Sequence, residues 1–476
     1  MGNDFTMGRQ LSALDAQFLN FETATNVAHI ASIAVLEDAS VTRAGIIELL
    51  RSRLHLAPPL KRRLVRVPFG LDHPYWDESK DVDFDYHVRE LALPSPGDDH
   101  QLAEQVARLH ARRLDRNRPL WEMYLVHGLE GGRSAIYTKV HHAAIDGIAG
   151  AEVLAALMDL SPEPREVPPP QEPPVTAPEP ALMLGRGVER FLDSPQALLR
   201  FVAGAIPRLD EIPVVSQIPG TGMLARFIRG AGWPGDTGSV LPDLPRVTVP
   251  ATPFSGPISG HRRFAFGRLA LDEVKKVKNE HHVTVNDVVM AVAATALRRW
   301  LSQRDELPVE PLVVGVPFSS NVRPELGNQV LLATTTLPTN VPDPQARLKI
   351  ISANMATVKE RFSVAPARWL LDFSQAMPAA LSGLADRAAF RLASGTVSAM
   401  NLMVSNVPGP QLPLYILGSK IVAHYPLSVI TDVSGGLNIT VFSYDGYLDV
   451  GIVVDRDMVP DVWDFIDYME DALAEL

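Results

Sequence analysis

A proline-rich segment, residues 161–180, constrains the possible folds more than any other feature of the sequence. Nine of its twenty residues (SPEPREVPPPQEPPVTAPEP) are proline. Because proline fixes φ and lacks a backbone N–H, the segment favours extended polyproline II structure over a helix or a central strand. The 476 residues leave room for more than one domain of about 100–200 residues. We therefore expect a first domain over residues 1–160, a proline-rich linker with connecting helices over 161–260, and a second domain over 261–476.

Charge and composition exclude several classes of protein. The formal net charge of −11 argues against nucleic acid as the main partner, because duplex binding requires Lys and Arg to neutralise phosphates. The chain has no cysteine, which excludes disulfides, thiolate metal sites and a cysteine nucleophile. The uncharged stretch 392–419 is interrupted by glycine, asparagine and proline and is a poor membrane span. We expect a cytoplasmic protein, either soluble or peripheral to a membrane or lipid droplet.

Residues 51–66 (RSRLHLAPPLKRRLVR) form a strongly basic run that contains no acidic residue. Two interpretations are open for it. It is either a solvated basic face or a contact surface for phosphate groups or a membrane.

The pattern of apolar residues predicts strands and helices in both halves of the chain. Ser12 and Asp15 have the spacing of a capping box at a helix N-terminus, residues 27–37 alternate like a strand and residues 42–54 repeat like a helix. Glycines at 131 and 132 lie between two strand-like runs, and Asp445-Gly446 between two others, which predicts two hairpins. We expect an α+β fold in which mixed sheets are faced by helices in each half.

The segment KVHHAAIDG contains the most informative polar cluster, with His141 and His142 four positions ahead of Asp146 and Gly147. A neutral histidine that points into a cleft can accept a proton near neutral pH, and strand periodicity places His142 on an inward face. Asp146, at the start of the next helix, can cap that helix and hold the loop by an ion pair. Gly147 permits a close backbone approach.

Other chemistry fits these residues less well. Taken alone, His142 could be a hydrogen-bonded core histidine and Asp146 an ordinary helix cap. Adjacent histidines on a strand point to opposite faces, so His141 and His142 make poor joint metal ligands, and we expect no metal site. The sequence has no G-x-S-x-G element, so a serine nucleophile also lacks support. A histidine that acts directly on a bound acceptor hydroxyl is the simpler mechanism.

Three shorter segments have sufficient structural explanations. Trp121 in PLWE starts a strand and is expected to pack in the core. Thr284 and Asp287 have capping-box spacing ahead of a long helix. The segment SNVPGP, residues 405–410, has the composition of a turn.

The motifs taken together resemble a known family. HHAAIDG, PLWE, VND and SNVPGP, in this order, with SALDAQFL near the start and the segment from NVPGPQLPLYILGSKI to the C-terminus, are similar to the bacterial wax ester synthase/diacylglycerol acyltransferase family. HHxxxDG is shared by the wider CoA-dependent acyltransferase superfamily, and the C-terminal signature narrows the resemblance. The similarity covers essentially the whole chain and is weakest over residues 161–260.

This resemblance implies two domains of chloramphenicol-acetyltransferase type with a tunnel at their interface. It implies acyl transfer from acyl-CoA, as co-substrate and without a bound cofactor, to the hydroxyl of diacylglycerol or a long-chain alcohol, without a covalent acyl-enzyme. His142 would be the general base, and Asp146 would orient the loop and pair with Arg323. The remaining motif residues would bind substrate or shape the tunnel: Trp121, Asn286, Asp287, Arg323, Asn406 and Pro408.

Two alternatives come from different classes of function. The first is a lipid-binding protein that keeps the fold and the tunnel without catalysis. The second is an acyltransferase of the same superfamily that uses another acceptor, such as a carrier-bound thioester or a polyketide hydroxyl.

Overall fold

The computed structural model describes most of the chain, with several gaps. The described residues are 8–78, 81–145, 155–169, 175–190, 248–319, 330–364 and 400–476, with residues 150, 153 and 192 as single positions. The predictions for Asp146, Gly147, Arg323 and the second connecting helix therefore lie outside the described residues.

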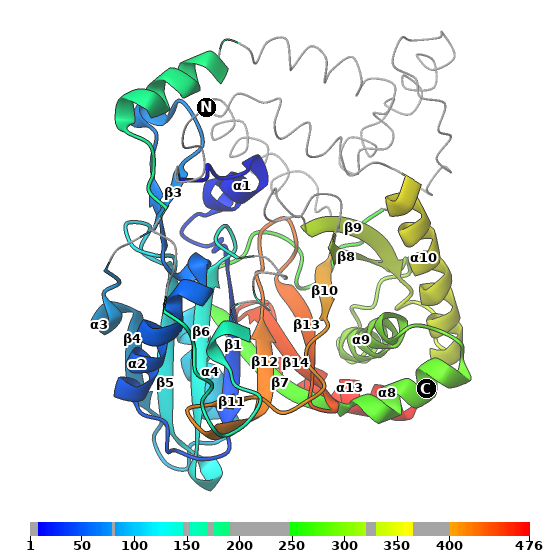
Figure 1. Ribbon diagram of the computed structural model, residues 1–476. Helices are drawn as coiled ribbons and strands as arrows, with labels where there is room; N and C mark the ends of the chain where they lie inside the picture. Colours follow the sequence, from blue (N-terminus) through cyan, green and yellow to red (C-terminus); the bar gives the residue numbers. More distant parts are fainter. Residues whose placement is uncertain are drawn as a thin grey trace.

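The first sheet is formed mainly by the N-terminal half of the chain (Figure 1). In spatial order its strands are β11 (Tyr415–Ile416), β12 (Ser419–Leu427), β1 (His29–Leu36), β6 (Arg133–His141), β5 (Trp121–Leu129) and β4 (Val88–Ala92). Strands β4 and β5 run parallel, whereas the other neighbours are antiparallel. Helix α2 (Arg43–Arg53) packs its apolar residues on one face, and α4 (Asp99–His110) packs on the other.

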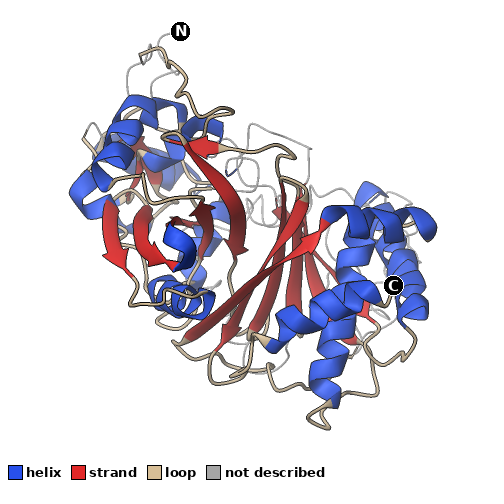
Figure 2. Ribbon diagram, turned by 90° about the horizontal axis from the view of Figure 1, so that it is seen from below, coloured by secondary structure: helices blue, strands red, loops and turns tan. Residues whose placement is uncertain are grey.

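The second sheet belongs to the C-terminal half, and helices cover it on one side (Figure 2). Its strands are, in order, β7 (Arg262–Ala270), β14 (Tyr447–Asp455), β13 (Leu437–Tyr444), β10 (Leu402–Val407), β8 (Leu312–Ser319) and β9 (Val330–Leu337). The covering helices are α8 (Leu271–Glu280), α9 (Val285–Ser302), α10 (Pro344–Val364) and α13 (Asp464–Ala474). Helix α9 is buried along nearly its whole length because it lies between the sheet and the other helices.

A strand from the C-terminal half completes the first sheet. Strand β12 pairs antiparallel with β1, with Ala31 opposite Leu427 and Ala34 opposite His424. The same strand also contacts β13 and β14 of the second sheet. Close packing at this junction leaves no room for a side chain at Gly451, where a Cβ would lie within 2 Å of the Pro426 carbonyl oxygen. The two halves are therefore joined through a shared strand as well as by surface contacts.

Both predicted hairpins are confirmed. Strands β13 and β14 meet with Tyr444 opposite Tyr447, and Asp445 and Gly446 have φ of 43° and 85°. Two consecutive positive φ angles define a type I′ turn, whose twist matches that of the flanking strands. The turn between β5 and β6 places Gly131 and Gly132 at φ of 77° and 73°.

The predicted α+β class is confirmed, because both sheets mix parallel and antiparallel pairs and carry helices. A small third sheet pairs β2 (Arg62–Val65) with β3 (Tyr75–Glu78). Residues 180–190 form the first connecting helix. Among the described residues, no helix has both the length and the apolar composition needed to cross a membrane.

Three basic residues of the run 51–66 have acidic partners within the fold, and the two interpretations of the run as a whole stay predictions. Arg53 is buried and lies 2.9 Å from a carboxylate oxygen of Asp159. Lys61 pairs with Glu78 at 3.0 Å and Arg63 with Asp77 at 2.8 Å.

Candidate active site

The two histidines of the HHxxxDG motif lie at the end of β6. His141 is the last residue of the strand and pairs with His29 at the start of β1. His142 opens a turn, and its backbone N–H donates to the Ala28 carbonyl oxygen at 2.8 Å. The strand thus ends one residue earlier than the strand periodicity predicted, so His142 is not a member of the strand face.

The ring of His141 is fully buried. Its Nδ1 accepts the backbone N–H of Ala143 at 3.0 Å. Burial lowers the pKa of His141 to about 3, and the neighbouring Arg116, His142 and Arg113 add to the shift. At neutral pH the ring therefore carries one proton, and the bond to Nδ1 places that proton on Nε2.

His142 is only partly buried, and its ring stacks on Phe18. The two ring centroids are 4.1 Å apart and the ring planes differ by 8°. Stacking of this kind fixes the plane of the imidazole. The two adjacent histidines thus have different surroundings, one buried and one partly accessible.

Helix α1 (Ala13–Phe21) supplies Phe18. The side chain of Ser12 accepts the Asp15 backbone N–H at 3.0 Å, which confirms the predicted N-terminal cap. The helix ends at Phe21, Glu22 is its C-cap residue, and the C-terminal half of the helix faces the histidines. Sequence reasoning found the cap but missed Phe18 and Glu22, because only the folded chain brings them beside residues 141 and 142.

A buried polar layer lies on the Tyr137–Lys139–His141 side of β6. Lys139 donates from Nζ to the carbonyl oxygens of Leu109 and Arg112, at 3.1 and 2.9 Å, and lies 3.5 Å from Glu122. Burial lowers the pKa of Lys139 to about 8, although Glu122 opposes the shift. These contacts attach the C-terminal end of α4 to β6, two residues from His141.

Trp121 lies close to the motif, whereas the other described motif residues lie on the second half of the chain. Trp121 starts β5 opposite Val140, is fully buried and donates from Nε1 to the Leu60 carbonyl oxygen at 2.7 Å. Its ring stacks on His87, with centroids 4.5 Å apart. The expected core packing of Trp121 is confirmed, and a role in substrate binding stays a prediction.

Asn286 and Asp287 lie in the first turn of α9. Thr284 Oγ1 accepts the Asp287 N–H at 3.2 Å, and the Asp287 carboxylate accepts the Thr284 N–H at 2.9 Å, so the predicted capping box is confirmed. The second carboxylate oxygen of Asp287 is buried and has no hydrogen-bond partner within the described parts of the chain. The role of both residues in shaping a tunnel stays a prediction.

The prediction that residues 405–410 form a turn is wrong for the first half of that segment. Asn406 lies in β10 and pairs in parallel with Val441 of β13. Pro408 follows the end of the strand, so the segment leaves the sheet only there. The β-branched residues of the strand and its two neighbours outweigh the turn composition.

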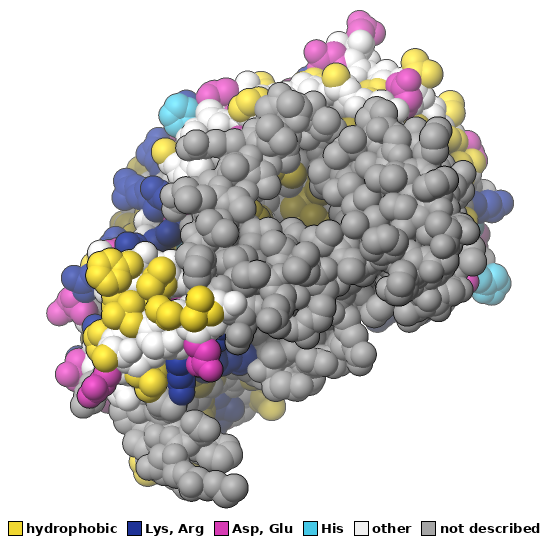
Figure 3. Space-filling view, turned by 90° about the horizontal axis from the view of Figure 1, so that it is seen from above, with side chains coloured by type: hydrophobic (Ala, Val, Ile, Leu, Met, Phe, Trp, Pro, Cys, Tyr) yellow, Lys and Arg dark blue, Asp and Glu magenta, His cyan; other side chains and the backbone are white. Residues whose placement is uncertain are grey.

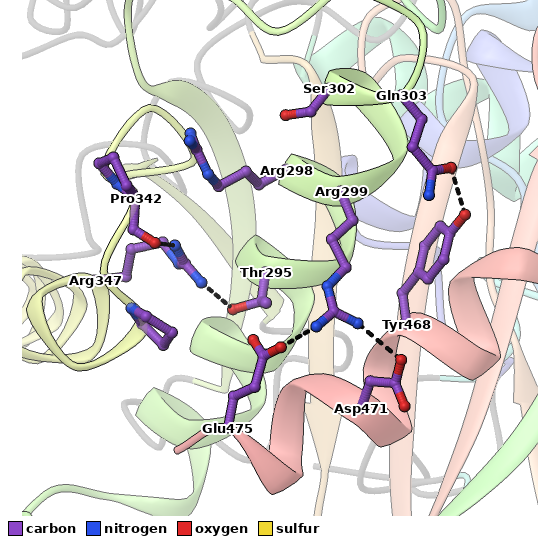
Figure 4. Close-up of a pocket in the computed structure, with 11 residues that line it drawn as sticks. Thr295, Arg298, Arg299, Ser302, Gln303, Pro342, Arg347, Tyr468, Asp471 and Glu475 are labelled. Carbon is purple, nitrogen blue, oxygen red and sulfur yellow. Dashed lines mark hydrogen bonds and ion pairs between the residues drawn. The ribbon is translucent and has the colours of Figure 1, made fainter.

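One pocket among the described residues lies away from the histidines. It has a volume of about 480 Å³ and lies among α9, α10 and α13 (Figure 4). Its charged groups have internal partners: Arg299 pairs with Asp471 and Glu475, and Arg347 donates to Thr295 and to two backbone carbonyl oxygens. This arrangement is a structural junction of three helices. Among the described residues, no three metal-ligating side chains cluster together.

The fold is of the two-domain, condensation-like class, and the family models define the activity as acyl transfer. The sequence model of the wax ester synthase/diacylglycerol acyltransferase catalytic domain matches residues 11–289, and that of the family's C-terminal domain matches residues 326–476. The chain belongs to this family and is an enzyme of the acyl-transfer class, as the sequence predicted.

Named relatives agree with this assignment. A Mycobacterium tuberculosis protein named as a diacylglycerol O-acyltransferase is 33% identical over 98% of this chain and 90% of its own length. The O-acyltransferase WSD of Acinetobacter baylyi is 29% identical, over 98% of this chain and 96% of its own.

Solved structures share the architecture. The wax ester synthase/diacylglycerol acyltransferase of Marinobacter aquaeolei superposes with a TM-score of 0.66 at 26% identity and covers 98% of both chains. The starter condensation domain of rhizomide synthetase superposes with a TM-score of 0.53 at 14% identity, over 98% of this chain and 95% of its own, and this similarity concerns the fold alone.

Proposed function

We propose that this protein transfers a long-chain acyl group from acyl-CoA to the hydroxyl of diacylglycerol or of a long-chain alcohol, with His142 as the general base. The observation that carries the proposal is the difference between the two histidines. His141 is buried and held by the Ala143 N–H, whereas His142 is partly accessible and held in plane by Phe18. Of the two rings, that of His142 is the more accessible one.

The proposed reaction needs no covalent acyl-enzyme intermediate. His142 removes the proton of the acceptor hydroxyl as its oxygen attacks the thioester carbonyl carbon. The new C–O ester bond forms, the C–S bond breaks, and the CoA thiolate takes the proton back from the histidine. The absence of cysteine supports direct transfer, because the most nucleophilic side chain for an acyl-enzyme is missing.

The proposed acceptors follow from the names of the relatives, which include diacylglycerol acyltransferases and a wax ester synthase. A lipid-binding protein would not require a partly accessible histidine beside a buried one. An acyltransferase with a different acceptor remains a second candidate, because its chemistry at His142 would be the same.

The decisive experiment offers the purified protein radiolabelled palmitoyl-CoA with dioleoylglycerol and hexadecanol in separate reactions. We expect triacylglycerol, wax ester or both, and no acyl adduct on the protein by mass spectrometry after an acid quench. An acyl adduct that forms and disappears at the rate of turnover would contradict direct transfer. Binding of palmitoyl-CoA with no product from either alcohol would favour another acceptor or the lipid-binding function.

We also propose that the first connecting helix and the turn beneath it contact a lipid surface. Phe69 is 90% exposed in the turn 68–70, and its φ of 60° is unusual for a bulky residue. Leu182 and Val188 are exposed on the helix 180–190, which packs on residues 67–72 through Met183 and Gly187. Figure 3 shows hydrophobic side chains gathered at one side of the face seen from above, with Lys and Arg beside them.

Replacing Phe69 with serine should therefore weaken binding to phosphatidylcholine–phosphatidylglycerol vesicles that contain dioleoylglycerol. Loss of one buried phenyl ring corresponds to about 1.5–3 kcal/mol, or about tenfold or more in the partition coefficient, measured by vesicle sedimentation. Val309, which is 85% exposed on the second half of the chain, provides the matched control Val309→Ser. Equal losses in the two variants would rule out a specific contact at Phe69.

A further inference from the structure

The carboxylate of Glu22 faces the buried histidine of the motif. Glu22 Oε1 lies 3.8 Å from His141 Nε2, and both side chains are about 1% exposed. Within the described parts of the chain, neither atom has a hydrogen-bond partner. The separation is about 1 Å longer than a hydrogen bond. A small movement of either side chain would let His141 Nε2–H donate to Glu22 Oε1, and each atom would then have a hydrogen-bond partner.

Two arginines hold the other oxygen of this carboxylate. Arg116 donates to Glu22 Oε2 from Nε and Nη2, at 3.0 and 2.6 Å, and also donates to the Leu19 carbonyl oxygen at 2.7 Å. The Nε of Arg113 lies 3.7 Å from the same carboxylate oxygen. Because Oε2 is occupied by these charged donors, Oε1 is the oxygen left to meet His141.

The opposite edge of the His141 ring is also fixed. Nδ1 accepts the Ala143 N–H at 3.0 Å, and the His141 carbonyl oxygen accepts the Ala144 N–H at 2.9 Å. Both bonds belong to the turn that contains His142. If Nε2 also donates to Glu22, the ring is held at both nitrogens and keeps only the Nε2–H tautomer and one orientation.

We infer that Glu22 is a positioning residue for the acyl transfer proposed above: it holds His141 in the Nε2–H tautomer and so fixes the turn that presents His142. Glu22 acts through His141 and does not contact substrate. The inference rests on the proposed function, since it matters for turnover only if His142 is the base. Phe18 and Glu22 are four residues apart in sequence, so a single short helix holds both histidines.

Glu22→Gln tests this arrangement with little change in shape. A glutamine has one acceptor oxygen, which the two Arg116 donors will take, so the amide NH2 turns toward His141 Nε2. A donor then faces a donor, and the ring must rotate or move its proton to Nδ1, where it meets the Ala143 N–H. We expect kcat to fall about tenfold or more, with KM changed less than about twofold.

The measurement combines turnover with a spectrum of the ring itself. In protein labelled with 15N-histidine, the His141 ring nitrogens, assigned by their loss in His141→Asn, report the tautomer directly. We expect the Nε2–H pattern in the natural protein and a changed pattern in Glu22→Gln. Glu104→Gln is the matched control, because Glu104 is an exposed partner of Arg108 on α4, and it should change neither the spectrum nor kcat.

Each outcome bears on a different statement. Wild-type kcat and an unchanged ring spectrum in Glu22→Gln, beside an inactive His142→Ala, would overturn this inference and leave the proposed function standing. Wild-type turnover in His142→Ala would overturn the proposed function and the catalytic part of the inference together. If Glu22→Gln does not fold, Glu22→Asp decides, because it keeps the charge for Arg116 but withdraws from His141. Wild-type kcat and ring spectrum in the folded Glu22→Asp variant would overturn the inference.

Discussion

Replacement of His142 with alanine is expected to lower kcat at least about a hundredfold. General acid–base catalysis by one side chain typically contributes about 10²–10⁴ in rate. In the His142→Ala variant, no other described side chain at the end of β6 can act as the general base. His141 cannot substitute, because it is fully buried and its Nδ1 is already an acceptor for Ala143. The comparison is best made as single-turnover rates of palmitoyl transfer, so that product release does not mask the chemical step.

The effect should be specific to this position. His281 lies in the polar turn that ends α8, and His281→Ala provides the matched control, for which we expect the rate of the natural protein. Thermal unfolding of both variants should match that of the natural protein, since His142 is only partly buried. Comparable rates for His142→Ala and His281→Ala would mean that another group removes the proton.

Acidification is expected to destabilise the protein strongly between pH 6.5 and about pH 4. Burial lowers the pKa of His110 and His141 to about 3 and that of His424 to about 4, and it also lowers the pKa of His29. Over this range the unfolded chain binds protons at these histidines and the folded protein does not, so the unfolded state gains stability as the pH falls. Above pH 6.5 the histidines are neutral in both states and the effect vanishes.

The expected size is large relative to the stability of a folded protein. A histidine that stays neutral in the fold contributes about 2 kcal/mol of destabilisation at pH 5, whereas a typical protein is stable by only about 5–15 kcal/mol. The midpoint of thermal unfolding, followed by intrinsic fluorescence from pH 8 to pH 4, should therefore fall steeply below pH 6.5.

His424 allows this cause to be isolated. Both of its ring nitrogens are buried without a hydrogen-bond partner in the described parts of the chain, and the ring packs against Phe442. His424→Leu should be at least as stable as the natural protein at pH 7, and its advantage should grow by about 1.4 kcal/mol per pH unit from pH 6.5 to about 4. An advantage that does not depend on pH would show that His424 is not a source of the acid sensitivity, and His281→Gln serves as the control.

Features that depend on neighbours in sequence could be predicted from the sequence. The caps at Ser12 and Thr284 and the turn at Asp445-Gly446 are local, because their hydrogen bonds and φ angles involve residues within about four positions. The HHxxxDG motif is local for the same reason, and the sequence therefore placed the candidate site at the end of the second strand of a hairpin.

Features that depend on long-range packing could not be predicted in this way. Nothing in the composition of residues 13–22 indicates that Phe18 stacks on a ring 124 positions away, or that Glu22 faces His141. The strand periodicity also extended β6 one residue too far, since the turn that ends it is stabilised by the His141 side chain. Proximity to α1 is what distinguishes the two histidines, and only the fold creates it.

Strand β12 has a consequence for how the chain is made. On a ribosome, β1 emerges long before the strand that pairs with its outer edge, because the two strands are far apart in the chain. Until then the first sheet presents an unpaired edge, which is a template for pairing with other chains. The nascent protein must therefore keep β1 from pairing with other chains until β12 has been made, and the first sheet is completed only when that strand is present.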